Sequence, residues 1–102
     1  MLAILMALMS SPNPAAASER LPWITPMDYP AALAASRPQG IVQVRLTFGG
    51  NGRVTGCETL KSSRSSILDS TTCALSQRRG RAKAGAPRVQ VLSHRWTAAA
   101  PR

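Results

Sequence analysis

Apolar and polar residues alternate in one stretch of this chain, residues 40–48. Every second position is apolar, and the residues between are polar: Val42, Val44, Leu46 and Phe48 against Gln43, Arg45 and Thr47. That period places the apolar set on one face of a half-buried strand. The run Gly49–Gly52 then breaks the pattern with residues that tolerate positive φ, and Arg53–Leu60 resumes an extended, β-branched pattern. The stretch therefore predicts a β-hairpin.

Three further elements are expected around this hairpin. Ala31–Ser36 is rich in alanine and predicts a short helix of one or two turns. Ile67–Arg79 has apolar residues at helical spacing, Asp69 in its first turn and two arginines in its last, which favours a second helix. Arg88–Thr97 predicts a third strand.

The order of these elements predicts a small α+β fold. We expect an antiparallel three-stranded sheet with a helix packed on one face, preceded by a short helix (αββαβ). The expected domain covers residues 31–97, after an extended lead-in at 18–30 that contains three prolines, and before a disordered tail at 98–102. The expected core is Ile41, Val42, Val44, Leu46, Phe48, Val54, Leu60, Ile67, Leu68, Leu75, Val89, Val91, Leu92 and Trp96.

The first seventeen residues resemble the back half of a secretory signal peptide. They carry no charged side chain, and an apolar run at Leu2–Met9 is followed by small residues at Ala15–Ala17. Eight apolar residues are too few to span a bilayer core of about 30 Å. We therefore expect export with cleavage after Ala17; the alternative is a disordered Ala/Pro tail on a cytosolic protein.

The chain is strongly basic, with thirteen Lys and Arg against four Asp and Glu and a formal net charge of +9. Such a charge favours anionic partners in general. The clearest basic patch is the set Arg78, Arg79, Arg81, Lys83 and Arg88. The four aromatic residues lie far apart in the sequence and form no stacking platform for nucleic acid. A solvated basic face and a weak anionic contact both remain open.

Two cysteines, Cys57 on the second expected strand and Cys73 in the helix, are an even pair. In an exported protein such a pair favours a disulfide that fastens the helix to the hairpin. Two independent thiols in a cytosolic protein are the alternative. A zinc site with His94 would lack a fourth ligand.

Catalytic chemistry finds little support in the sequence. His94 is the only histidine, the four acidic residues are scattered, and no serine has a base at a recognisable spacing. The Gly49–Gly52 run joins two strands instead of leading a strand into a helix, so it indicates a turn and not a phosphate loop. We expect neither an enzyme nor a cofactor.

Several of these residues, in their order, resemble the C-terminal domain of TonB-type energy transducers, which shares its architecture with the TolA C-terminal domain. The matching features are Tyr29-Pro30-Ala31-Ala32, Gly40–Phe48, Asn51-Gly52-Arg53-Val54, Ser62-Ser63, Leu68-Asp69 and the basic run from Arg78. The resemblance covers about residues 26–96. Full-length members also have a membrane anchor and a Pro-rich spacer, which we do not recognise in this sequence; an in-frame extension upstream of Met1 would restore them and would make the protein membrane-anchored.

The resemblance implies a periplasmic protein-interaction domain in outer-membrane transport, which binds receptor segments by adding a strand to a sheet edge. Because the third strand follows a crossover from the helix, we expect it at an edge of the sheet, where its backbone can pair with a peptide. The expected peptide-binding strand is Arg88, Val89, Gln90, Val91, Leu92, Ser93, His94 and Arg95. The alternatives are an idle edge guarded by arginine, and a small basic binder of an envelope polyanion or nucleic acid without a transport role.

Overall fold

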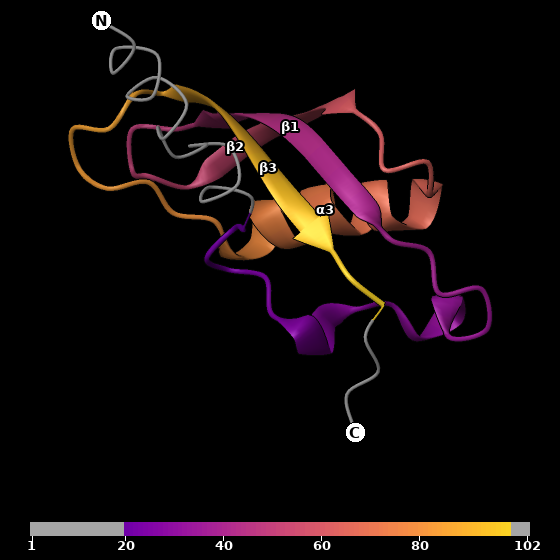
Figure 1. Ribbon diagram of the computed structural model, residues 1–102. Helices are drawn as coiled ribbons and strands as arrows, with labels where there is room; N and C mark the ends of the chain where they lie inside the picture. The colour runs from indigo at the N-terminus through magenta and orange to yellow at the C-terminus, as the bar shows by residue number, and fades with distance from the viewer. Residues whose placement is uncertain (1–19, 99–102) are drawn as a thin grey trace, which may run out of the picture.

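Within residues 20–98, a three-stranded sheet and one α-helix form the fold. The computed structural model describes residues 20–98, so the leader at 1–17 and the tail after Ala98 lie outside the described residues. The elements in chain order are two 3-10 turns, η1 (Pro26–Asp28) and η2 (Ala31–Leu33), then β1 (Gly40–Phe48), β2 (Val54–Lys61), α3 (Ser66–Arg79) and β3 (Val89–Trp96) (Figure 1). The predicted α+β fold is confirmed.

The sheet has the order β2-β1-β3, and both pairings are antiparallel. The alternating stretch forms the central strand β1. Its side chains Val42, Val44 and Leu46 are fully buried, whereas Arg45 points to the open face and forms an ion pair with Glu58 of β2. The predicted register of β1 is therefore confirmed. Both β2 and β3 lie at edges of the sheet.

Helix α3 begins where the sequence offers a cap. The Ser65 side chain accepts a hydrogen bond from the Leu68 N–H at 3.2 Å, and Gly80 ends the helix. A disulfide joins Cys73 of α3 to Cys57 of β2, with their Cα atoms 5.7 Å apart. The predicted disulfide is thus confirmed, and it holds the helix over the β2 side of the sheet.

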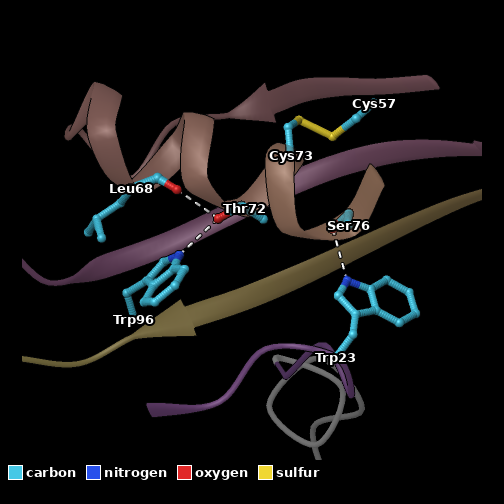
Figure 2. Close-up of a disulfide and its surroundings, with 7 residues drawn as sticks. All are labelled: Trp23, Cys57, Leu68, Thr72, Cys73, Ser76 and Trp96. Carbon is cyan, nitrogen blue, oxygen red and sulfur yellow. Dashed lines mark hydrogen bonds between the residues drawn. A yellow bond between two sulfur atoms is a disulfide. The ribbon is translucent and has the colours of Figure 1, made fainter. Parts of the chain in front are cut away.

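The opposite side of α3 faces two tryptophans (Figure 2). The Trp96 indole donates to the Thr72 hydroxyl at 2.8 Å, and the Trp23 indole donates to the Ser76 hydroxyl at 2.9 Å. Thr72 in turn donates to the Leu68 carbonyl at 2.8 Å. Buried polar groups are costly only when they lack a partner, so these hydroxyls bind the helix to β3 and to the lead-in without a desolvation penalty.

The lead-in packs into the core beneath β3, although the sequence offered few apolar residues there. Leu21, Ile24 and Leu33 are buried. The helix expected at Ala31–Ser36 is only the 3-10 turn η2, since so short a segment cannot offset the cost of α-helix nucleation. The chain then leaves the helical region at Arg37, which has φ +48° and precedes a proline.

Part of the expected core is wrong. Val89 and Val91 are each 52% exposed, and Leu60 and Ile67 are exposed as well. For Val89 and Val91 the reason is the parity of β3: the side chains of Trp96 and of its even-numbered neighbours face the helix, so the odd-numbered valines face the open side of the sheet.

Candidate functional site

The outer edge of β3 is the first candidate site. Sequence reasoning expected a binding strand at Arg88–Arg95, and the structure forms β3 over nearly the same residues at one end of the sheet order. The sheet order places β1 as the only described neighbour of β3. An edge strand of this kind has one row of backbone groups directed away from the sheet.

The register identifies the groups in that outward row. The Phe48 N–H donates to the Arg88 carbonyl at 2.7 Å, so residue 88 is paired inward with β1. Inward and outward residues alternate along an antiparallel strand, and the β1–β3 register has no irregularity. Gln90 and Leu92 therefore direct their N–H and C=O groups toward β1, whereas Val91 and Ser93 direct theirs outward.

The side chains of β3 divide between two faces of the sheet. On the open face Val91 lies opposite Arg45 of β1, and its side chain stays half exposed. On the inner face Gln90 and Leu92 are half-buried, and His94 is buried. The strand thus presents an accessible backbone at Val91 and Ser93, with apolar side chains nearby on both faces.

His94 has a structural place in the core beneath β3. It is 7% exposed, and its Nδ1 accepts a hydrogen bond from the Leu21 N–H at 3.0 Å. Burial, with a smaller effect from the positive charge of Arg20, lowers the pKa of His94 to about 4. The neutral imidazole anchors the lead-in, and its side chain faces away from the open side of the sheet. The sequence carried no signal for this role.

The residues of the expected basic patch lie in different surroundings in the structure. Arg79 forms a bidentate contact with the Asp28 carboxylate, at 2.9 and 3.2 Å, and holds the pKa of Asp28 at about 2. Lys83 and Arg88 instead line a hollow of about 400 Å³ against the hairpin turn at residues 49–52. The remaining patch members, Arg78 and Arg81, are exposed.

A smaller and more apolar pocket of about 270 Å³ lies beside this hollow, under the start of β3. Its walls come from three parts of the chain: Trp23 of the lead-in, Phe48 of β1 and Leu92 of β3, with Arg81 and Lys83 at its border. Sequence reasoning missed this pocket, because no local pattern relates the lead-in to β3.

The described part of the chain holds neither a cluster of metal-ligating side chains nor a membrane-spanning helix. Within residues 20–98, no three His, Cys, Asp or Glu side chains gather as metal ligands would. The same residues include no helix of sufficient length and apolar character to cross a bilayer.

Comparison with known families decides the family of the chain. The model described as Gram-negative bacterial TonB protein C-terminal matches residues 25–94, which is well over half of the sequence. The chain belongs to this family. Comparisons with curated proteins and with solved structures gave no match.

As a TonB C-terminal domain, the protein belongs to a class of interaction domains of the Gram-negative envelope that act in transport energy transduction. The class implies partners among envelope or outer-membrane proteins. The matched range runs from just after Trp23 to His94, so it includes the hairpin, α3 and most of β3.

Proposed function

We propose that this TonB C-terminal domain binds an extended segment of an outer-membrane receptor by β-strand addition to the outer edge of β3, and so takes part in transport across the outer membrane. Membership of the family supports the class of partner. The observation that carries the binding mode is the outward direction of the Val91 and Ser93 backbone groups on an edge strand.

Strand addition fits this edge for a physical reason. Backbone N–H and C=O groups provide affinity that depends little on the ligand's side chains, and side-chain pockets on either face then provide selectivity. The half-exposed side chains of Val89 and Val91 would gain cover from a neighbouring strand.

Proline substitution tests the binding mode directly, and the register of β3 determines the position at which the proline is placed. Val91→Pro removes an outward N–H, and proline is tolerated on an edge strand when the missing N–H faces solvent. We expect Val91→Pro to abolish the binding of receptor N-terminal peptides with the fold retained. Val91→Ala keeps the N–H and should still bind, weakened only by the loss of side-chain cover. Leu92→Pro, by contrast, removes an inward bond and should disrupt the sheet.

The measurement is a titration of the oxidised domain with these peptides, followed by backbone amide shifts, with circular dichroism as the check on folding. Strand addition is rejected if Val91→Pro stays folded and binds as tightly as Val91→Ala. Shifts that gather on residues 78–88 and disappear with added salt would instead favour the polyanion alternative.

We also propose that residues 1–17 direct export and that the working compartment is the periplasm. The disulfide supports this proposal, since such bonds persist in oxidising compartments. Mass spectrometry of the protein from envelope fractions should find an N-terminus near Ser18 and no alkylatable thiol. A full-length chain with two free thiols in the cytosol would contradict it.

A further inference from the structure

The hollow between the hairpin turn and the loop before β3 has walls that are fixed by the fold. The Ala82 N–H donates to the Gly52 carbonyl at 2.8 Å, and the Phe48 N–H donates to the Arg88 carbonyl at 2.7 Å, so both ends of the loop are bonded to the hairpin. Gly52 permits the close approach, because it has φ +84° and a Cβ there would lie 2.8 Å from the Ala82 carbonyl oxygen. The hollow is therefore preformed, and its volume of about 400 Å³ is typical of small-molecule sites.

Two cations with no carboxylate opposite them line this hollow. Lys83 lies near one end of the loop and Arg88 at the other, and both side chains are exposed. The Arg88 guanidinium reaches across to the hairpin turn, since one of its Nη atoms is 3.6 Å from the position that a Cβ on Gly50 would occupy. No acidic residue of the described chain lines the hollow. The acids among residues 20–98 are engaged elsewhere: Asp28 with Arg79, Glu58 with Arg45, and Asp69 with the serines before α3.

The hairpin turn adds backbone donors. The Gly52 N–H donates to the Gly49 carbonyl at 3.0 Å, which leaves Gly50 and Asn51 at the centre of the turn. Both central residues line the hollow, and among residues 20–98 no group accepts a hydrogen bond from either N–H. Successive N–H groups in a turn form concavities that bind anions. No helix follows this turn, so the positive charge comes from the facing loop and not from a helix N-terminus.

We propose that this hollow is a binding site for a phosphate monoester, such as a sugar phosphate. A phosphate monoester carries about two negative charges at neutral pH and has several acceptor oxygens, which match two cations and the donors of the turn. The planar fork of Arg88 suits two phosphoryl oxygens at once, and Lys83 supplies a point charge. The remaining volume holds the group esterified to the phosphate. The hollow is separate from the outer edge of β3, so the inference does not rest on the proposed strand addition.

Titration of the oxidised full chain with glucose 6-phosphate tests the site, at constant ionic strength and with glucose as the matched ligand without phosphate. We expect saturable backbone amide shifts at residues 49–52 and 82–88 with the ester, and none with glucose. Arg88→Gln should weaken binding by about 10-fold to 100-fold, as expected for the loss of hydrogen bonds from a charged group. Arg88→Lys, which keeps the charge without the fork, should weaken it less. Both variants keep the Arg88 carbonyl bond to β1, and circular dichroism checks their folding.

A second pair of variants separates the hollow from the net charge of the protein. Lys83→Gln removes a cation that lines the hollow, whereas Lys61→Gln removes one from β2, outside it. We expect about 10-fold weaker binding in Lys83→Gln and unchanged binding in Lys61→Gln. Equal losses in the two variants would assign the binding to net charge and overturn the site. Equal shifts with glucose, or no saturable shift on a folded chain, would overturn it as well.

Vesicles distinguish a soluble ester from a lipid headgroup. Phosphatidic acid carries a phosphate monoester and phosphatidylglycerol a diester, and each is mixed into phosphatidylcholine to the same surface charge. Co-sedimentation with phosphatidic acid vesicles that is lost in Arg88→Gln would support the site and identify a lipid as the source of the phosphate. Binding of glucose 6-phosphate without vesicle binding would support the site for a soluble ligand. Equal co-sedimentation with both lipids, unchanged in Arg88→Gln, would reveal a general attraction to anionic surfaces and overturn the site.

Discussion

Protonation of His94 should destabilise this domain as the pH falls from 6.5 toward 4. His94 is buried under β3, and its Nδ1 accepts the Leu21 N–H. An added proton would place a positive charge in the core and convert that acceptor into a donor facing another donor. The result would be loss of the lead-in's contact with β3.

The size of the effect follows from the pKa. In the unfolded chain the histidine has the ordinary value of 6.5, and in the fold the value is about 4. One pKa unit corresponds to about 1.4 kcal/mol, so neutral His94 contributes roughly 3 kcal/mol to the free energy of unfolding. Because the folded pKa is the lower one, that contribution is complete above pH 6.5. It declines as the pH falls toward 4 and then levels off.

His94 is the only histidine in the sequence, so no other imidazole contributes to the pH dependence of unfolding. Urea unfolding, followed by the fluorescence of Trp23 and Trp96, should give a free energy that falls steadily between pH 6.5 and 4. Asp28, with its pKa lowered from 3.8 to about 2 chiefly by its hydrogen bond from Arg79, titrates only below this window. His94→Gln, which keeps a side-chain acceptor without the proton, should give a nearly flat profile there.

Two results would refute the reasoning about His94. One is a wild-type stability that does not change between pH 6.5 and 4, which would mean that the imidazole is as easily protonated in the fold as in the unfolded chain. The other is an equal slope in His94→Gln, which would assign the pH dependence to other groups.

Two further predictions concern the sheet and the disulfide. Leu46→Ala should cost about 2–5 kcal/mol of stability, because Leu46 is fully buried. Arg45→Ala should cost no more than about 1 kcal/mol, since its ion pair with Glu58 is exposed. Equal losses of stability in urea unfolding would contradict the register of β1. Replacement of Cys57 and Cys73 by serine should lower stability by about 3 kcal/mol for a loop of this length, and an unchanged unfolding midpoint would contradict a stabilising role for the bond.

The hairpin was predictable because one physical rule dominates it. Strict alternation at residues 42–48 forces one face inward, and the glycine-rich turn leaves few options for the next strand. The disulfide was predictable for another reason, since Cys57 and Cys73 are an even pair in a chain that we expect to be exported. The pattern also predicted the order of the elements, and the structure confirms the fold class. Family resemblance added the class of protein, and the family match confirms it.

The third strand itself was predicted, but its buried face resisted prediction because its apolar residues lie on both faces. Val89 and Val91 share one parity, and Leu92 and Trp96 share the other, so the sequence alone does not decide which set is buried. Contacts with the distant lead-in decide it, through His94 and Trp96. The same contacts determine which backbone groups face outward, so the proline test belongs at Val91 and not at Gln90 or Leu92.

The pocket under the start of β3 could not be predicted from the sequence for a related reason. Trp23, Phe48 and Leu92 come from three separate segments, and no spacing relates them. Trp23 lies in a lead-in with three prolines, and its indole donates to Ser76, a polar residue on the inner side of α3.

The disulfide and the indole hydrogen bonds on the two sides of α3 affect the entropy cost of ligand binding. The disulfide ties the helix to β2, and the two indole bonds tie it to β3 and to the lead-in. Both edge strands of the sheet are therefore already ordered in the free domain. The conformational entropy of ordering β3 is lost during folding and not during binding. A preorganised edge lets a weak, short peptide bind with little of its interaction energy spent on ordering the receptor domain. The entropy cost of association then falls mainly on the incoming segment.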